Sequence, residues 1–424
     1  MAKVKTALEA IAGIKSNTRV FIQGGSATPT VLIDALVERA PELENVELIH
    51  LHTEGKAAYA KLEFAKSFRV ANIFVGENMR GALDYDRVDF IPCFLSEVPQ
   101  LFRSRRRPLD VAIIHVSPPD KHGYCTLGTS VDVAKAAVEV APIIIAQINA
   151  KMPRIHGDGF IHIDRFAKYI EIDEPIYQVS RSKLSELDLA IGEKVATLVE
   201  NGATLQAGIG SVPDAVLAAL KGHKNLGVHT EMWSNGTLDL IKCGAVDNSL
   251  KAVHPGKTVS AFIMGDQEVY DFAHDNPSII QLDMGYINDP GVIKRNKKIT
   301  AINSAVEIDL TGQVCADSIG SRIISGVGGQ MDFIRGASLS EGGKPIIAIS
   351  SQTKKGQSRI VPVLKLGAGV VTTRANVHFV VTEYGVADLY GKTLHERAKA
   401  LIAIAHPDHR GSLDQERHRI FCRV

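Results

Sequence analysis

Residues 21–36, FIQGGSATPTVLIDAL, join a short apolar run to a helical pattern through a glycine-rich turn. The pattern returns at residues 205–220, LQAGIGSVPDAVLAAL, with Pro213 in the place of Pro29. An apolar strand followed by a turn and a helix is the unit of parallel sheets that carry helices on both faces. The sequence therefore predicts an α/β fold with mostly parallel sheets.

Two further echoes occur in the same order along the chain. The first is the tripeptide HTE, at 52–54 and 229–231, and the second is a pattern of Asp, Gly and Cys, at Asp120, Gly123 and Cys125 and again at Asp309, Gly312 and Cys315. An ordered set of echoes at similar spacing indicates an internal duplication. We predict two related open α/β domains, residues 1–182 and 183–424, that join near the polar segment 180–189, with the chemistry in the second.

Length and charge favour a small-molecule ligand. A chain of 424 residues exceeds what one hydrophobic core usually holds. Its 48 Lys and Arg nearly balance its 47 Asp and Glu, so no net field favours nucleic acid or an anionic membrane. No apolar stretch approaches the roughly 18 to 20 residues that cross a bilayer. We expect neither nucleic acid nor membrane as a partner.

The cysteines indicate a reducing compartment. They are scattered, odd in number and without a CxxC pair: Cys93, Cys125, Cys243, Cys315 and Cys422. This set fits neither a disulfide framework nor a zinc ribbon. The first residues lack the apolar core and cleavage site of a secretory signal, so we expect a cytoplasmic protein.

Residues 227–236, GVHTEMWSNG, place one acid, Glu231, directly after an apolar run. In open α/β sheets ligands gather beyond the carboxyl ends of the strands, so such a junction is a candidate site. Judged from the residues alone, an acid there is more often a cap, and we assign that role to its counterpart Glu54. His50 and His52 form an HxH pair, but no acid or cysteine cluster completes a coordination set, so no metal site is expected.

A series of motifs covers most of the chain, from about residue 18 to 415. They read SPPDKHGYCTLG, INAKMPRIHGDGFIH, AGIGSVPDAV, HTEMWSNG, MGDQEVYDF, SGVGGQMDF, TEYGVADL and AHPDHRGSL. Together they resemble the acetyl-CoA hydrolase/transferase branch of the class I CoA-transferases, and within it the 4-hydroxybutyrate and butyryl-CoA:acetate CoA-transferases. The resemblance implies the CoA-transferase fold, which is NagB/RpiA-like.

The resemblance implies a ping-pong transfer of CoA between an acyl-CoA and a short carboxylate such as acetate, butyrate or 4-hydroxybutyrate. Glu231 would be the nucleophile, passing through an acyl anhydride and a glutamyl-CoA thioester. Two alternatives remain: an acyl-CoA hydrolase on the same fold, and a CoA-binding protein without catalysis. CoA enters as a thioester substrate, no tightly bound cofactor is expected, and the family implies a homodimer.

The resemblance also assigns roles around Glu231. Asn288 would sit near the nucleophile, and Glu383 would line the same cleft. For His52 the residues themselves favour a structural or a substrate-lining role. Glycine-rich turns can present backbone N–H groups to an oxyanion or to CoA. The residues implied for this role are Gly208, Ile209, Gly210, Gly328 and Gly329.

Several residues have simpler interpretations. The arginines at 103, 105, 106 and 107 could bind the phosphates of CoA, but a solvated surface is the better interpretation. Neither glycine-rich turn has the G-x-G-x-x-G spacing, so a dinucleotide cofactor is not expected. Cys315 has no basic partner nearby in sequence and is predicted to lie in the core. Trp233 could pack on substrate or on the core.

Overall fold

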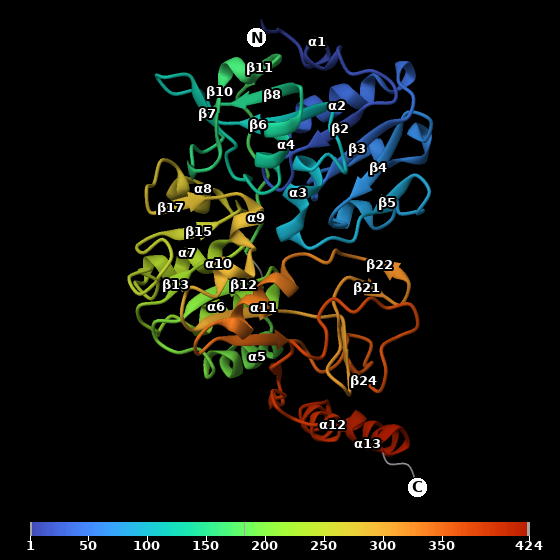
Figure 1. Ribbon diagram of the computed structural model, residues 1–424, viewed down its shortest axis with the longest axis vertical. Helices are drawn as coiled ribbons and strands as arrows, with labels where there is room; N and C mark the ends of the chain where they lie inside the picture. Colours follow the sequence, from blue (N-terminus) through green and yellow to red (C-terminus); the bar gives the residue numbers. More distant parts are fainter. Residues whose placement is uncertain (1, 182, 422–424) are drawn as a thin grey trace. The chain divides into compact units, whose positions relative to one another are not determined.

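The structure, a computed structural model, describes residues 2–181 and 183–421 (Figure 1). Cys422 lies outside this range. None of the helices in the described part of the chain is long and apolar enough to cross a membrane. The helices are α1 (Ala7–Ile11), α2 (Thr30–Glu38), α3 (Val98–Arg103), α4 (Ala134–Val140), α5 (Glu186–Ala196), α6 (Ser211–Ala219), α7 (Asn235–Lys242), α8 (Gln267–Ala273), α9 (Met284–Ile287), α10 (Pro290–Ile293), α11 (Gln330–Leu339), α12 (Leu394–Ala403) and α13 (Pro407–Phe421).

The chain forms two compact units, and the division differs from the predicted one. Unit 1 comprises Met1–Ser180 and Val259–Ile287, and unit 2 comprises Arg181–Thr258 and Asn288–Val424. The first boundary falls close to the predicted junction at 182. The predicted second domain, 183–424, is interrupted because Val259–Ile287 packs with unit 1.

Hydrogen bonds hold the inserted segment in unit 1. Strand β17 (Ile279–Gln281) pairs in parallel with β9 (His156–Gly157). The hydroxyl groups of Tyr270 and Ser26 lie 2.6 Å apart in a buried hydrogen bond. These pairings join residues far apart in sequence, so neither composition nor periodicity could reveal them.

Unit 1 is built on an eight-stranded sheet in which every neighbouring pair is parallel. Its order is β1 (Ala2–Lys3), β11 (Lys168–Ile172), β8 (Ile143–Asn149), β6 (Val111–Val116), β2 (Arg19–Ile22), β3 (Val46–His50), β4 (Phe68–Asn72) and β5 (Val88–Phe90). Every residue of β6 is buried, as expected for a central strand covered on both faces.

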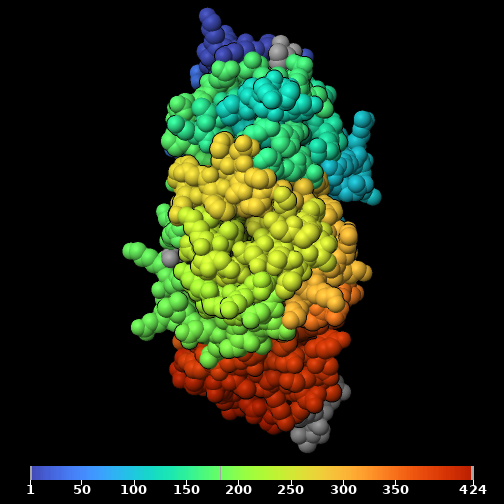
Figure 2. Space-filling view, turned by 90° about the vertical axis from the view of Figure 1, so that its left-hand side faces the viewer, coloured from blue at the N-terminus to red at the C-terminus, as the bar shows by residue number. Residues whose placement is uncertain are grey.

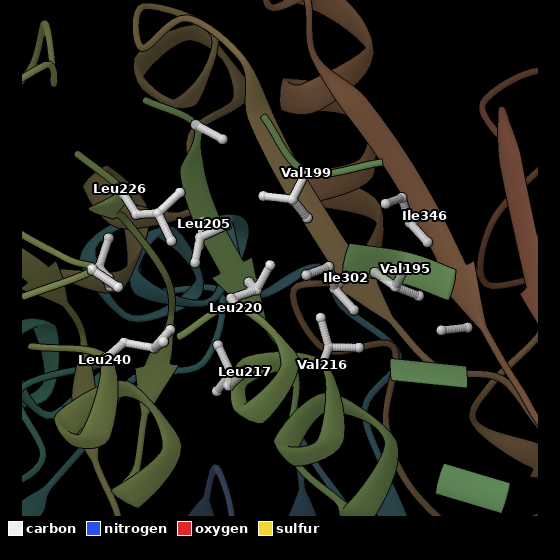
Figure 3. Close-up of a cluster of buried hydrophobic side chains, with 14 of the residues drawn as sticks. Val195, Val199, Leu205, Val216, Leu217, Leu220, Leu226, Leu240, Ile302 and Ile346 are labelled. Carbon is white, nitrogen blue, oxygen red and sulfur yellow. The ribbon is translucent and has the colours of Figure 1, made fainter. Parts of the chain in front are cut away.

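Unit 2 is built on a six-stranded sheet that is parallel except for its last pair. Its order is β13 (Gly227–Val228), β12 (Thr204–Ala207), β18 (Ile299–Asn303), β23 (Lys344–Ala348), β25 (Phe379–Thr382) and β26 (Gly385–Asp388). Figure 3 shows the apolar cluster beneath α5 and α6, where Val195, Val216 and Leu217 meet Leu205 and Ile302 of the sheet. Figure 2 shows that the yellow-green part of the chain, which includes α7, lies at the surface that faces the viewer.

The two sheets repeat one topology. The order β3-β2-β6-β8-β11 in unit 1 matches β13-β12-β18-β23-β25 in unit 2. The glycine turns at 24–25 and 208–210 lead from β2 into α2 and from β12 into α6. The prediction of two α/β domains with mostly parallel sheets is confirmed.

Short strands complete both units. They are β7 (Tyr124–Thr126), β10 (Phe160–His162), β14 (Met232–Trp233), β15 (Thr258–Ser260), β16 (Phe262–Ile263), β19 (Glu307–Asp309), β20 (Val314–Cys315), β21 (Ser318–Ile319), β22 (Arg322–Ile323) and β24 (Ile360–Val361). One of them, β14, begins directly after Glu231.

Candidate active site

Glu231 lies just beyond the carboxyl end of β13, at the edge of the unit 2 sheet. The backbone N–H of His229 donates to the Leu205 carbonyl (3.1 Å), which continues the parallel pairing past the end of β13. The hydroxyl of Thr230 donates to the Met232 carbonyl at 2.9 Å. These bonds fix the backbone on both sides of Glu231 and so fix where its side chain starts.

Asn288 connects the carboxylate of Glu231 to a second acid. Its side-chain nitrogen, Nδ2, lies 3.3 Å from Oε2 of Glu231 and 3.2 Å from Oδ2 of Asp332. Asn288 is fully buried, and its Oδ1 has no hydrogen-bond partner among the described residues. One amide group therefore donates to two carboxylates and leaves an acceptor free.

Gly329 touches the same carboxylate with its backbone. A Cβ placed on Gly329 would lie 1.8 Å from Oε2 of Glu231 and 2.4 Å from Nδ2 of Asn288, so any side chain there would displace these groups. The backbone N–H of Gly329 interacts with Glu231 and lowers the pKa of its carboxyl group. Gly329 is also the N-cap of α11, where exposed N–H groups favour negative charge.

The pKa of Glu231 is raised from its ordinary value of 4.5 to about 7. Burial is the largest cause, and the charge of Asp332 raises the pKa further. Hydrogen bonds from Asn288 and Gly329 oppose these effects but do not cancel them. A carboxylate that is desolvated and held by two donors is a more reactive nucleophile than one in water, and shifts of this kind cluster at functional sites.

This arrangement predicts how activity depends on pH. If Glu231 acts as the nucleophile, its ionised form is the one that reacts, and kcat/KM should fall with slope one as the pH drops below about 7. Asp332→Asn removes a charge that raises the pKa of Glu231, so the acid limb should move to lower pH. Asn288→Ala removes a donor that lowers it, so the limb should move to higher pH and the plateau should fall roughly 10²-fold.

The measurement is a pH profile of kcat/KM for the wild type and both variants. Opposite displacements of the acid limb are the signature of electrostatic coupling through Asn288. Displacement in the same direction by both variants would contradict the geometry, since a general loosening of the site would act alike in each.

The glycine turn at 208–210 joins β12 to α6. The N–H of Gly208 already donates to the Ile302 carbonyl (3.0 Å), and its nearest neighbours are Ile302 and Asn303. Ile209 is 64% exposed, and Gly210 has a positive φ of 119° as the residue before α6. The turn thus stays a candidate for contacting CoA, whereas the amide of Gly208 is occupied within the sheet.

The remaining predicted residues are Gly328, Glu383 and His52, and each has a defined backbone conformation or defined contacts. Gly328 precedes Gly329 with a φ of 64°, which favours glycine. Glu383 follows β25, and its carboxylate accepts from the backbone N–H (2.9 Å) and the hydroxyl (2.5 Å) of Ser351. His52 belongs to unit 1, where its ring packs against Phe74 and Phe262 and burial lowers its pKa to about 4. Their proposed roles in lining a substrate site stay predictions.

Asp332 and Lys251 are residues that sequence reasoning missed. Asp332 stands in the quoted stretch SGVGGQMDF, and Asp132 occupies the corresponding place at the start of α4, so the duplication could have drawn attention to it. Lys251 is 4% exposed, and its Nζ donates to the carbonyls of Val228 (2.7 Å) and Lys257 (2.6 Å). Burial lowers the pKa of Lys251 to about 7, and nothing in its local sequence indicates this.

The structure agrees with the simpler interpretations of the arginine cluster and of Cys315. Arg103 pairs with Glu139 and Asp283, and Arg107 pairs with Glu47, all within unit 1. Cys315 is fully buried and burial raises the pKa of its thiol, as predicted for a core cysteine. Trp233 is 1% exposed, which places its ring in the core.

Comparison with known proteins identifies the family of this chain. Residues 1–179 match the acetyl-CoA hydrolase/transferase N-terminal domain, and residues 265–417 match the C-terminal domain of the same family. These two matches cover most of the chain and agree with the resemblance drawn from the motifs.

Relatives extend the match over nearly the full length. A succinyl-CoA:acetate/propanoyl-CoA:succinate CoA transferase from Fasciola hepatica is 51% identical over 95% of this chain and 85% of its own. A 4-hydroxybutyrate coenzyme A transferase from Clostridium kluyveri is 48% identical over 98% and 97%. The crystal structure of a 4-hydroxybutyrate CoA-transferase from Porphyromonas gingivalis superposes with a TM-score of 0.85 at 41% identity, covering 99% and 98%. An acetyl-CoA hydrolase from Candida albicans is more distant, at 26% identity over 91% and 82%.

Proposed function

The chain belongs to the acetyl-CoA hydrolase/transferase family, and we propose that Glu231 is the covalent nucleophile of its reaction. The enzyme is an acyl-CoA:carboxylate CoA-transferase, the activity in the names of its relatives at 51% and 48% identity. Its substrates are an acyl-CoA and a short-chain carboxylate such as acetate, butyrate or 4-hydroxybutyrate. One observation carries the assignment: a partly desolvated carboxylate, the Asn288 amide and the Gly329 backbone converge at one point.

The first half of the reaction moves CoA onto the protein. An oxygen of the Glu231 carboxylate attacks the thioester carbon, the C–S bond breaks, and CoA leaves as a thiolate while a mixed anhydride forms. The thiolate then attacks the side-chain carbonyl carbon of Glu231. The first carboxylate leaves, and a glutamyl-CoA thioester remains.

The second half reverses these steps with a different acid. The incoming carboxylate attacks the glutamyl carbonyl carbon, and the C–S bond to CoA breaks. CoA leaves as a thiolate, and Glu231 and the incoming acid are then joined as a new mixed anhydride. The thiolate attacks the acyl carbon of that anhydride, so the new acyl-CoA departs and the Glu231 carboxylate is restored. No net proton is taken up or released, so no general acid is required.

The residues around Glu231 suit these steps. Each tetrahedral intermediate places a negative charge on oxygen, and the Gly329 N–H and the Asn288 amide stand where they can donate to it. Neither donor needs to reorganise, since Gly329 acts through its backbone and Asn288 is held by Asp332. We further propose that the turn at Gly328 and Gly329 contacts bound CoA.

Hydrolysis is the alternative outcome at this site. Water entering at the anhydride or the thioester would release the acid and CoA, so a hydrolase would differ only in its final acceptor. The greater similarity to transferases than to hydrolases favours transfer. We also propose a cytoplasmic homodimer, in keeping with the scattered free cysteines and with the family.

Reductive trapping tests the covalent step. After incubation with acetyl-CoA alone, borohydride should reduce the glutamyl thioester to an alcohol, and peptide mass spectrometry should find that alcohol at Glu231. Acetate in place of acetyl-CoA gives no thioester and serves as the control. An unmodified Glu231 under conditions in which the protein transfers CoA would contradict the mechanism, as would modification at another acid.

A further inference from the structure

Unit 1 contains a cavity of about 190 Å³ at the carboxyl ends of its central strands. His115 of β6 and Gln147 of β8 line it, beside the start of α2. Glu54 and Tyr177 also line it from loop segments. Its volume falls below the roughly 300 to 1,000 Å³ of drug-sized sites, so it suits a ligand of only a few heavy atoms.

His115 provides an unsatisfied hydrogen-bonding group on the cavity wall. The residue is 3% exposed, and its ring donates a hydrogen bond of poor geometry to the Thr28 backbone, so that the other ring nitrogen is left without a partner within the described part of the chain. Burial lowers the pKa of the imidazole to about 4, against a smaller opposing effect of the Thr28 backbone, so the ring is neutral. A neutral imidazole has one donor and one acceptor, and leaving the acceptor unpaired in a buried position is costly.

The charges on the lining select the class of ligand. Two carboxylates, Glu54 and Glu174, line the cavity, and no Lys or Arg from residues 2–181 or 183–421 does. Glu77 adds a third negative charge that acts on Glu54. Anions are therefore disfavoured, including the carboxylic acids and the CoA phosphates that the catalytic reaction uses.

The described residues give a metal ion no ligand set here. In residues 2–181 and 183–421, no group of three or more His, Cys, Asp or Glu side chains is close enough to hold one. The lining also has an apolar part, formed by Ile172, Pro175 and Ile176, and the aromatic ring of Tyr177. An organic cation satisfies both the acidic and the apolar groups.

We propose that this cavity binds a small primary ammonium compound. Its N–H groups donate to the Glu54 carboxylate and to the acceptor nitrogen of His115, while its alkyl chain lies against Ile172 and Ile176. Every residue that lines this cavity belongs to unit 1, whereas Glu231 belongs to unit 2.

The duplication explains how the two sites relate. Glu54 and Glu231 hold the same place in the HTE tripeptides, but their surroundings differ. The backbone N–H of Glu54 donates to the Thr28 hydroxyl (3.0 Å), and the Tyr177 hydroxyl interacts with its carboxyl group. Glu231 instead meets an amide side chain and a glycine backbone. One position thus serves a covalent reaction in unit 2 and reversible binding in unit 1.

Calorimetric titration of the full chain at pH 8 with n-butylamine tests the proposal, with 1-butanol as its neutral analogue. We expect butylamine to bind with a Kd of the order of 1 mM and butanol to bind far more weakly. Glu54→Gln should weaken butylamine binding by at least about tenfold. Glu63→Gln, which removes an exposed charge of the same unit, should leave it unchanged.

Two more variants separate this site from alternatives. Glu231→Gln should bind butylamine as the wild type does, so loss of binding there would assign the amine to the catalytic carboxylate and overturn the proposal. His115→Leu should lose affinity at least about tenfold while its melting temperature holds or rises, because a buried nitrogen without a partner disappears. Absence of heat with the wild type, or equal binding of butylamine and butanol, would also overturn it, whatever the outcome of trapping at Glu231.

Discussion

Glu231→Gln should lower the rate of CoA transfer by about 10⁴-fold or more. The amide keeps the shape of the side chain but cannot attack a thioester carbon. Asp332 cannot replace it, because its carboxylate is buried behind Asn288 and accepts from that residue. Initial rates of butyryl-CoA formation from acetyl-CoA and butyrate measure the effect.

Glu193→Gln is the matched control, since it removes an exposed carboxylate from α5 of the same unit. It should transfer CoA at the wild-type rate. A Glu231→Gln enzyme with more than a few per cent of wild-type activity would exclude covalent catalysis by this residue.

The same substitution should stabilise the fold at alkaline pH. Folding raises the pKa of Glu231 from 4.5 to about 7, so the native state favours the protonated form. The stability from this group is complete below about pH 4.5 and is lost as the pH rises through about 7. Glu231→Gln should therefore melt at a higher temperature than the wild type at pH 8, with a smaller difference at pH 5. Lower stability at both pH values would indicate a structural role instead.

The sequence predicted the fold because the deciding signals are local. The turns at 24–25 and 208–210 each stand between an apolar strand and an amphipathic helix, and that order determines a parallel α/β unit. The ordered echoes predicted the duplication, which the shared strand order then displayed. Both inferences need only neighbours in sequence or a comparison of the chain with itself.

The site was predictable only in part, because its contacts are distant in sequence. Family motifs indicated Glu231, Asn288 and Gly329 separately, but the bond from Asn288 to Asp332 depends on how α11 starts beside the residues after α9. The occupied amide of Gly208 depends on pairing with β18. No periodicity encodes such contacts, and the burial of Lys251 between two carbonyls is of the same kind.

The insertion of Val259–Ile287 in unit 1 shows the limit of reasoning from the duplication. Aligning the two halves predicts two continuous domains, since a repeat is expected to fold as one stretch. Strand β17 instead pairs with β9, so part of the second half belongs to unit 1. Pairing of short strands depends on the edges available in the folded unit, which the alignment does not describe.

Gly329→Ala should lower kcat/KM by about 10³-fold while the protein stays folded. The added Cβ would overlap Oε2 of Glu231 at 1.8 Å, so the carboxylate must turn away from its donors. The backbone itself imposes no penalty, because Gly329 has φ −94° and ψ 4°, which alanine can adopt. Steady-state kinetics and the thermal unfolding temperature together separate displacement of the nucleophile from loss of the fold.

Gly222→Ala is the matched control for this change. A Cβ at Gly222 meets no atom within 4 Å, so the same methyl group is added to unit 2 without a clash. Its kinetics should equal those of the wild type. If Gly329→Ala kept wild-type kcat/KM, then Glu231 would have to react from another position, and the approach of the Gly329 backbone to its carboxylate could not be part of catalysis. The expected result is a Gly329→Ala enzyme that reacts slowly but still forms the glutamyl thioester on prolonged incubation. Such a result would show that Gly329 raises the rate by positioning Glu231 and by donating its N–H, while the covalent chemistry belongs to Glu231.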